Sequence, residues 1–351
     1  MVKPIENVPL SGYSTMRLGG PARYFTDVAL PGQLSEAIEW ARSNRLPWRV
    51  IGGGSNIVFE DAGFQGLIIR NRIRGVSFAT DGQDVILQAG AGEHWDDIVR
   101  LSCERGLYGI AELSMIPGTV GATPVQNIGA YGREISEVLS SVTVYDSHDS
   151  SWKTLLPEDC RFAYRSSIFN STEKGRYAIA SVTYRLSLTP HGAPLYASLA
   201  SYLSGFEIAD HDPFTIRSGV IAIRMTKLPD PGKVANLGSF FKNPIISAVQ
   251  AEKIMKKHPE MPVYPTADGR IKLAAGWLIE KAHLKGYENH GFCTYKENAL
   301  VVVNKSSRSS SDLHAFRQEI ITRIKAQFGV TLEQEPEIIG GEASAQPDPN
   351  A

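Results

Sequence analysis

A segment rich in glycine and proline, residues 116–132, constrains the fold of this chain more than any other feature. It carries four glycines and two prolines in 17 residues, a content that excludes a regular helix or strand along its length. We therefore expect a long loop of defined shape. Hydroxyl and amide donors are spaced along it at Thr119, Thr123, Gln126 and Asn127. Such donors on an apolar backbone suit a planar heteroaromatic ligand, although a structural Ω-loop fits the composition equally well.

The overall composition excludes several classes of protein. The 351 residues include 36 Lys and Arg against 37 Asp and Glu, and the length fits two or three domains of roughly 100–200 residues each. A net charge of −1 disfavours a dedicated nucleic-acid or anionic-membrane binder. The longest apolar runs, such as 299–303, are far shorter than the ~18 residues of a membrane span. The first residues also lack the apolar core of a signal peptide.

The cysteines and histidines disfavour a metal site. Three cysteines, Cys103, Cys160 and Cys293, are widely spaced, and the eight histidines are scattered. Neither set has the spacing of a disulfide framework or of a zinc site. We therefore expect no metal and a reducing, cytoplasmic location.

Apolar periodicity and shifts in composition divide the chain into successive units. Residues 1–74 are expected to form a small α/β unit, residues 75–219 a second unit and residues 220–330 an α+β unit. A strand-like segment, 331–340, closes the fold, and the tail 341–351 is expected to be disordered. Helical spacing predicts helices near residues 34–44, 95–102, 247–255, 274–283 and 313–328. Short apolar or alternating runs predict strands near residues 48–51, 64–69, 85–88, 182–188, 299–303 and 330–339.

A glycine cluster lies between the first two predicted strands. Gly52, Gly53, Gly54, Ser55 and Asn56 follow the apolar run 48–51, so that bare backbone amides there could approach a pyrophosphate closely. The cluster is neither a GxGxxG fingerprint nor a Walker loop. A tight turn without a ligand remains an equal alternative.

Two later segments concentrate positive charge. The segment 161–169 places two arginines among aromatic and apolar residues, and one of them could face an anion, although a single arginine is more often on the surface. The segment 224–244 carries Arg224, Lys227, Lys233 and Lys242. Its prolines are expected to keep it out of regular helix, as a pocket for a diphosphate or carboxylate would require.

A serine and an acidic segment could supply proton chemistry. Ser239 lies between Gly238 and Phe240, and without a Gly-x-Ser-x-Gly elbow it is a poor hydrolase nucleophile. It could relay a proton, or it could simply form a turn. The segment 333–337 places carboxylates before the final strand. Glu337 would act as a general acid or enolate stabiliser if it faced the arginine and the serine; otherwise the segment is a solvated turn.

Taken together and in this order, these segments resemble the UDP-N-acetylenolpyruvoylglucosamine reductase family, bacterial flavoenzymes of peptidoglycan precursor synthesis. The resemblance runs from Ser14-Thr15 and Gly19–Ala22 to Glu335–Glu337 and includes the words GGGSN, IPGTVGATPVQNIGAYG, CRFAYRSSIF, TKLPDP, GSFFKNP, KLAAGWLI and EPE. It implies an α+β fold, in which a two-part FAD-binding module of the p-cresol methylhydroxylase type (about residues 15–187) precedes an α+β substrate-binding domain. TKLPDP and the insertion around 188–220 resemble the family form with a substrate-covering tyrosine, which Tyr196 matches.

The resemblance also implies a reaction. NADPH would reduce a noncovalent FAD, and the flavin would then reduce UDP-N-acetylglucosamine enolpyruvate to UDP-N-acetylmuramate in the same site. Arg165 matches the arginine that polarises the substrate carboxylate, Glu337 the carboxylate that cooperates with it as an acid, and Ser239 the serine that protonates the α-carbon. A cytoplasmic, monomeric oxidoreductase of cell-wall biogenesis, with a role in cell shape and cell division, would follow.

Further positions match the family's binding segments. The residues expected at the cofactor are Gly52, Gly53, Gly54, Ser55, Asn56, Pro117, Gly118, Gly121, Thr123, Gln126 and Gly129. The residues expected at the substrate are Tyr196, Arg224, Lys227 and Asn243. Two positions depart from the family pattern: Tyr295 stands where a histidine is frequent, and Ala122 stands where some members have a serine.

Two other functions compete with this interpretation. One is a flavin-dependent sugar oxidase or dehydrogenase of the same superfamily, which often tethers its flavin through His or Cys. Neither residue occurs in 116–132 or beside Gly52–Asn56, which favours noncovalent FAD. The other is a non-catalytic nucleotide-sugar-binding protein, which the presence of Arg165, Ser239 and Glu337 disfavours.

Overall fold

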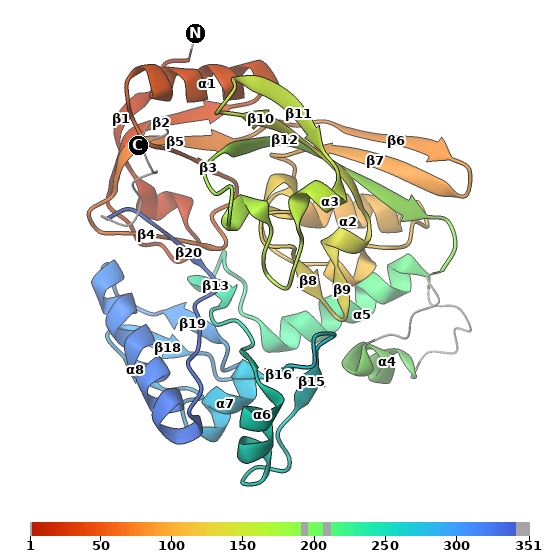
Figure 1. Cartoon of the computed structure of the whole chain (residues 1–351), viewed down its shortest axis with the longest axis vertical. Coiled ribbons are helices and arrows are strands. Elements are labelled where there is room, and N and C mark those ends of the chain that lie inside the picture. Colours follow the sequence, from red (N-terminus) through yellow and green to blue (C-terminus); the bar gives the residue numbers. More distant parts are fainter. Residues whose placement is uncertain (1, 191–195, 206–211, 342–351) are drawn as a thin grey trace.

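A computed structural model describes residues 2–190, 196–205 and 212–341. The expected disordered tail therefore lies outside the described residues, apart from Gly341. Figure 1 shows the N-terminal elements, coloured red to yellow-green, in one half of the molecule and the C-terminal elements, coloured teal to blue, in the other. None of the helices in the described segments has the length and apolar run needed to cross a bilayer.

The first sheet has four strands, and three of them are parallel to one another. In sheet order the strands are β1 (Ile5–Pro9), β2 (Pro21–Val28), β5 (Phe64–Asn71) and β3 (Trp48–Ile51). Strand β1 is antiparallel to β2, whereas β2–β5 and β3–β5 are parallel. Helix α1 (Pro31–Ser43) packs on this sheet through buried Leu34, Ile38 and Ala41, which confirms the predicted helical face. The glycine cluster follows β3 and leads into the short strand β4 (Ile57–Phe59).

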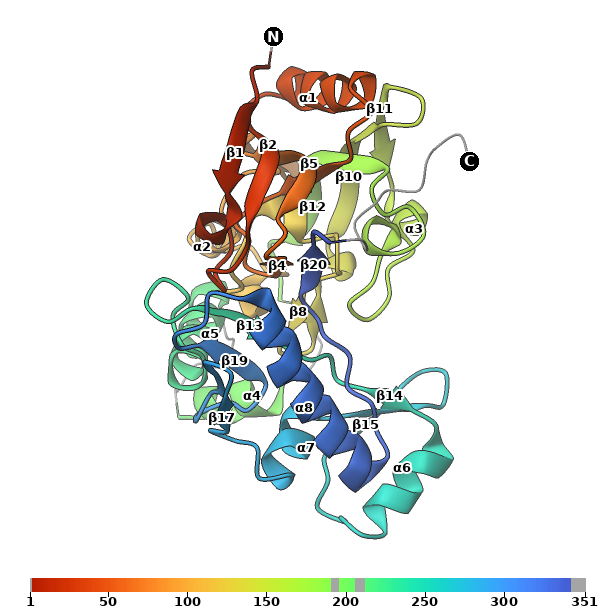
Figure 2. The same ribbon diagram turned by 90° about the vertical axis from the view of Figure 1, so that its left-hand side faces the viewer.

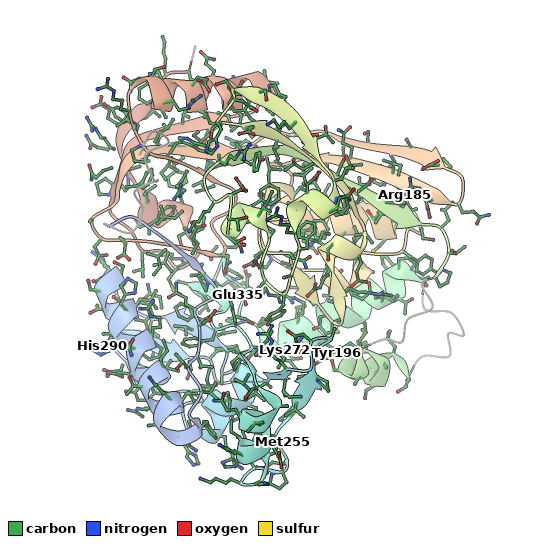
Figure 3. All side chains as sticks on the ribbon, viewed as in Figure 1. Arg185, Tyr196, Met255, Lys272, His290 and Glu335 are labelled. Atoms are coloured by element: carbon green, nitrogen blue, oxygen red, sulfur yellow. The ribbon has the colours of Figure 1, made fainter. Side chains whose placement is uncertain are left out.

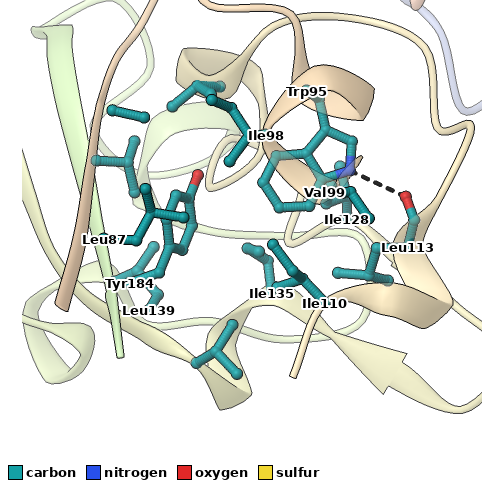
Figure 4. Close-up of a cluster of buried hydrophobic side chains, with 14 of the residues drawn as sticks. Leu87, Trp95, Ile98, Val99, Ile110, Leu113, Ile128, Ile135, Leu139 and Tyr184 are labelled. Carbon is teal, nitrogen blue, oxygen red and sulfur yellow. Dashed lines mark hydrogen bonds between the residues drawn. The ribbon is translucent and has the colours of Figure 1, made fainter. Parts of the chain in front are cut away.

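The second sheet is antiparallel and has five strands. In sheet order they are β11 (Ser151–Leu155), β10 (Leu139–Asp146), β12 (Tyr177–Ser187), β7 (Asp84–Gly90) and β6 (Val76–Asp81). Helix α2 (Trp95–Cys103) packs against it, and Trp95 and Tyr184 are fully buried at the centre of this core (Figure 4). The Trp95 indole donates a hydrogen bond to the Leu113 carbonyl at 3.0 Å, so the core also holds the chain just before residues 116–132.

The C-terminal half contains a second four-stranded sheet and a three-stranded one. The four strands are β13 (Asn236–Ser239), β19 (Val301–Asn304), β18 (Phe292–Thr294) and β17 (Glu288–Asn289); the three are β14 (Ile245–Ile246), β16 (Ile271–Leu273) and β15 (Val263–Pro265). Helix α8 (Ser310–Phe328) buries Leu313, Phe316, Ile320, Ile324 and Phe328, as its periodicity predicts. The remaining elements are α3 (Pro157–Cys160), β8 (Gly129–Ala130), β9 (Arg133–Glu134), α4 (Ala197–Leu203), α5 (Pro213–Lys227), α6 (Ala248–Met255) and α7 (Ala275–Lys281).

The end of the chain returns from the C-terminal half to the N-terminal half. The amide of Lys242 donates to the Glu333 carbonyl and that of Glu335 donates to the Phe240 carbonyl, each at 2.9 Å. Strand β20 (Glu337–Ile339) then pairs in parallel with β4, and Figure 2 shows the two side by side above α8. The predicted strand over 330–339 is thus shorter than expected, because its first part crosses between the two halves. The expected unit boundaries at residues 74, 219 and 330 remain a proposal.

A second connection between the halves caps helix α8. The carboxylate of Asp61, which follows β4, accepts hydrogen bonds from the amide of Ser310 and the hydroxyl of Ser309, both at 2.7 Å. Burial raises the pKa of Asp61, but the hydrogen bonds from Ser309, Ser310 and Ser311 outweigh it, and the pKa lies below its ordinary value. The adjacent Glu60 accepts from Ser310 and lies 2.8 Å from the His314 imidazole. Two neighbouring carboxylates thus hold the first turn of α8 to the N-terminal half.

We predict that Asp61→Ala destabilises the protein at neutral pH by about 1 kcal/mol, the usual contribution of a helix cap. Because the pKa of Asp61 is lowered on folding, its contribution is present above the unfolded-state value of about 4 and is lost as the pH falls through the folded-state value. Urea unfolding at pH 7 and at about pH 3 therefore measures a difference between variant and wild type that shrinks in acid.

Ser247→Ala is the matched control, because the Ser247 hydroxyl accepts from the Gln250 amide and caps α6 within a single domain. It should cost a similar free energy at both pH values, since a hydroxyl does not titrate in this range. If Asp61→Ala shows no loss of stability at pH 7, the cap between the halves contributes nothing.

Candidate active site

A cavity of about 730 Å³ lies where the two halves meet, and residues from both halves line it. Figure 3 shows Tyr196, Lys272 and Glu335 along this junction. Eleven of the predicted site residues line the cavity: Ser55, Asn56, Pro117, Gln126, Gly129, Arg165, Tyr196, Arg224, Lys227, Ser239 and Asn243. Segments that are far apart in the sequence therefore meet around one space.

Arg165 and Glu335 form an ion pair in the wall of this cavity. The Arg165 Nε atom lies 3.1 Å from Glu335 Oε1, and its Nη2 donates to the Gly129 carbonyl at 2.8 Å. The Nε proton has no well-directed hydrogen-bond acceptor among the described residues, so the contact with Glu335 is mainly electrostatic. Arg165 itself has a positive φ of 53°, which is uncommon for a residue with a side chain, and it lines the cavity.

Burial dominates the protonation of Glu335. It raises the pKa of this carboxyl, and the positive charges of Arg165 and Lys242 only partly oppose the shift. A carboxyl with a raised pKa keeps its proton at a higher pH than an exposed one. Glu335 is therefore suited to act as an acid beside a fixed guanidinium.

Glu337 does not face Arg165 or Ser239, although its expected role as an acid requires that it does. It lies on β20, it is not among the residues that line the cavity, and it forms an ion pair with Lys174 at 2.8 Å. The chain changes its hydrogen-bonding partner at Pro336: Glu335 bonds to the Phe240 carbonyl, whereas the Glu337 amide bonds to the Asn56 carbonyl. Glu335, the first glutamate of the same EPE word, is the one that lies beside Arg165, and the catalytic role expected of Glu337 stays a prediction.

Ser239 ends strand β13 and is exposed at the cavity. Gly238, with a positive φ of 70°, makes the preceding bend, and its amide donates to the Asn236 side chain at 2.8 Å. Asn236 is buried and bonds in turn to the carbonyls of Pro229 and Val234. No group in the described part of the chain is hydrogen-bonded to the Ser239 hydroxyl, which leaves it available to a ligand.

Arg224 and Lys227 project from the last turns of helix α5, which contradicts the expectation of a non-helical segment. The first proline that interrupts the chain here is Pro229, after the helix has ended. Arg224 donates to the Met115 carbonyl at 3.1 Å, and its Nε has no hydrogen-bond partner among the described residues. Both cations line the cavity from this helix.

Further side chains complete the cavity, although the sequence did not single them out. Lys272 lies over the Tyr164 ring, 4.8 Å from its centroid, and Tyr131 meets Tyr196 edge to face at 6.0 Å. The Asn243 side chain accepts from the Ala275 amide at the start of α7. Tyr131, Tyr164 and Lys272 all lie within the quoted sequence words, so the words marked the segments but not these individual residues.

The two predicted flavin-binding segments contact each other. A Cβ atom on Gly52 would overlap the Thr119 hydroxyl, and one on Gly53 would lie 3.4 Å from the Gly118 Cα. Asn56 donates to the Gln126 side chain at 2.9 Å. The polar side chains of Asn56 and Gln126 thus border one end of the cavity, and the bare backbone of the glycines packs beside them, as a site for a nucleotide cofactor requires.

The other residues expected at the cofactor support this loop from behind. Thr123 is buried and shares a hydrogen bond of 2.8 Å with the Tyr184 hydroxyl. Gly121 packs against Ala91 so closely that a Cβ would lie 2.7 Å from the alanine side chain. Neither residue lines the cavity, and neither do Gly52, Gly53, Gly54 and Gly118. No group of acidic, histidine and cysteine residues suited to a metal ion occurs in the described segments.

Comparisons with known proteins agree with this geometry. Residues 24–155 match a family model described as an FAD binding domain, and residues 230–339 match one described as UDP-N-acetylenolpyruvoylglucosamine reductase, C-terminal domain. The crystal structure of the reductase from Thermus caldophilus has the same fold, with a TM-score of 0.67 over 97% of this chain and all of that one at 23% identity. The expected α+β class, with an FAD-binding module and a substrate-binding domain, is confirmed.

The curated relatives are similar over nearly their full length. The UDP-N-acetylenolpyruvoylglucosamine reductase of Neisseria gonorrhoeae is 41% identical over 95% of this chain and 97% of its own length. The protein of that name from Pseudomonas aeruginosa is 39% identical over 95% of this chain and 98% of its own length. This chain therefore belongs to the UDP-N-acetylenolpyruvoylglucosamine reductase family.

Proposed function

We propose that this protein reduces the enolpyruvyl ether of UDP-N-acetylglucosamine enolpyruvate to the lactyl ether of UDP-N-acetylmuramate, with NADPH as the hydride donor and FAD as a noncovalent cofactor. The observation that carries the proposal is the partly buried Arg165–Glu335 pair, which borders a cavity shared with the exposed Ser239 hydroxyl. A guanidinium, a carboxyl with a raised pKa and a free hydroxyl are the groups that such a reduction needs around one carboxylate. The identities of the substrate and the cofactor follow from membership of the family.

Bound FAD would supply the two-electron chemistry that carries a hydride from NADPH to the β-carbon of the substrate. The residues that would hold it are the glycine cluster, the facing backbone of residues 117–121, and the Asn56 and Gln126 side chains. These groups fit the cofactor because they offer close backbone approach and neutral hydrogen-bond donors beside an open cavity. No His or Cys lies in either segment, in agreement with noncovalent binding.

The Arg165 guanidinium would bind the enolpyruvyl carboxylate. Its other contacts, with the Gly129 carbonyl and with Glu335, fix its plane before the substrate arrives. Negative charge that develops on the carboxylate during reduction then meets a preorganised cation, an effect commonly worth several kcal/mol. Glu335, with its raised pKa, would share its proton with this oxygen and stabilise the enolate.

Ser239 would donate the proton that the α-carbon receives. Its hydroxyl has no competing partner among the described residues, and the rigid bend at Gly238 keeps it at the cavity. Because a hydroxyl is a weak acid, the lost proton must be replaced through water, which the exposure of Ser239 permits. Arg224, Lys227, Asn243 and Tyr196 would bind the UDP diphosphate and cover the substrate.

The biological setting follows from the same proposal. UDP-N-acetylmuramate is a precursor of peptidoglycan, so the reaction would serve cell-wall biogenesis and with it cell shape and cell division. The three cysteines are free thiols, which suits the reducing cytoplasm. We also propose that the protein acts as a monomer.

We predict that Gly52→Ala lowers the affinity for FAD by about tenfold or more, because the new methyl group must push Thr119 away and separate the two facing segments. Bound flavin is measured from its absorbance after gel filtration, and the dissociation constant from fluorescence titration. Gly32→Ala in helix α1 is the control, since nothing lies within 4 Å of its added Cβ and the residue does not line the cavity. Equal FAD affinity in both variants would contradict this placement of the cofactor.

We predict that the purified protein is yellow, that NADPH bleaches it anaerobically, and that UDP-N-acetylglucosamine enolpyruvate restores the colour. Ser239→Ala should bleach at the wild-type rate but recolour about 10²–10⁴-fold more slowly, because only the second step needs its proton. Stopped-flow absorbance separates the two steps.

Three results would contradict these assignments. A protein that cannot bind FAD is not a flavoenzyme. A protein that recolours only with oxygen is the oxidase described above as an alternative. Equal slowing of both steps in Ser239→Ala would mean that Ser239 is not the proton donor.

A further inference from the structure

Helix α5 carries two of the cations at the cavity, so its position matters for any bound anion. Arg224 and Lys227 line the cavity from its last turns, while Ile216 and Val220 bury its apolar face in the core of the N-terminal half. Apolar packing alone leaves a helix some freedom to slide or rotate, because it is not directional. Directional contacts must therefore set the exact orientation of the two cations.

One such contact is the ion pair between Arg217 and Asp96. The two guanidinium nitrogens of Arg217 donate to the two carboxylate oxygens of Asp96 at 2.6 and 2.8 Å. Arg217 is 8% exposed, and Asp96 lies in the first turn of α2, 121 positions earlier in the chain. A bidentate pair fixes both distance and orientation.

The same Asp96 carboxylate also binds the residue just before the segment 116–132, which we call the cofactor loop. Asp96 Oδ1 accepts a hydrogen bond of 2.6 Å from the Met115 amide, and Met115 has a positive φ of 58°, which is uncommon for a residue with a side chain. The Met115 carbonyl then accepts from Arg224 of α5 at 3.1 Å. Ile116 and Pro117, which follow directly, line the cavity.

These contacts attach α5 to the loop at two points. Arg217 and Arg224 are seven residues apart, which places them on the same face of the helix about 10 Å apart along its axis. Arg217 is bonded to Asp96, and Arg224 is bonded to Met115, whose amide is also bonded to Asp96. Attachment at two points opposes both sliding and rotation, which attachment at one point would allow.

We propose that Asp96 and Arg217 are positioning residues that hold the cations of α5 at a fixed place relative to the cofactor loop, and that they thereby set the affinity for both ligands of the cavity. The inference rests on the proposed function for the identity of these ligands, FAD and the UDP-sugar. Neither residue touches the cavity, so both act through Met115 and through helix α5.

The test uses the full-length protein with Arg217→Met, which keeps most of the side-chain volume but removes the fork. We expect the dissociation constants for FAD and for UDP-N-acetylglucosamine enolpyruvate each to rise at least about fivefold. Flavin fluorescence reports the first constant, and the change of flavin absorbance on sugar binding reports the second; neither needs turnover. Arg217→Lys should recover part of the affinity, since it restores the charge without the bidentate geometry.

Arg176→Met is the matched control. Arg176 forms a bidentate pair with Asp146, which is fully buried in the same half, and neither residue lines the cavity. This variant should lower the urea midpoint while leaving both dissociation constants at their wild-type values. Should Arg217→Met unfold, Asp96→Asn provides the same test, because it removes the charge and retains an oxygen for the Met115 amide.

Two results would overturn the proposal: unchanged dissociation constants in a folded Arg217→Met or Asp96→Asn variant, or an equal rise in Arg176→Met. Failure of the proposed function looks different. In that case the wild-type protein would not bind the enolpyruvyl sugar at all, and FAD affinity alone would decide whether Asp96 and Arg217 position the loop.

Discussion

The parallel pairing of β20 with β4 is the contact on which the candidate active site depends. It brings the last residues of the C-terminal half back to the N-terminal half, one residue after the glycine cluster ends. The segment before it runs beside residues 240–242, so one stretch of chain touches Asn56, Phe240 and the wall of the cavity. Glu335 can meet Arg165 only because the chain crosses at this place.

The arrangement of charge in the cavity separates groups that hold the fold from groups left for a ligand. Arg217, which lies behind the cavity, and Arg165, which lies in its wall, each have a carboxylate partner, and a buried cation without one would strongly destabilise the fold. Lys227 faces the same space without an ion-pair partner among the described residues. A net charge of −1 over the whole chain therefore coexists with a cavity suited to a diphosphate. Overall charge could not have revealed this pocket, because the net charge of a chain does not report where its cations gather.

Local periodicity predicted much of the fold, and ordered sequence words predicted much of the site. The helices at residues 31–43, 95–103 and 310–328 were predicted from apolar spacing, because each buries one face against a sheet or a neighbouring helix. The prolines beyond Lys227 led to a wrong prediction for α5, since a helix can end just before a proline. The length of β20 was also overestimated, because apolar residues that cross between two cores have the same composition as a strand.

The choice between Glu335 and Glu337 depends on tertiary contacts that spacing does not encode. The two residues share one sequence word, and Pro336 lets the chain change its hydrogen-bonding partner between them. The Asp96–Arg217 pair escaped prediction for a related reason: its members are separated by more than a hundred residues, and each alone resembles a surface charge. Pairings of this kind become visible only in the folded structure.

The comparison of Glu335→Gln with Glu337→Gln tests the account most directly. Steady-state turnover with NADPH and the enolpyruvyl sugar should fall about 10²–10⁴-fold in Glu335→Gln, because the partly buried acid beside Arg165 is lost. Glu337→Gln, which breaks only the ion pair with Lys174, should retain turnover within about twofold of wild type, as for an exposed pair. The reverse result, with turnover lost in Glu337→Gln and kept in Glu335→Gln, would contradict the assignment of the active site to the Arg165–Glu335 pair.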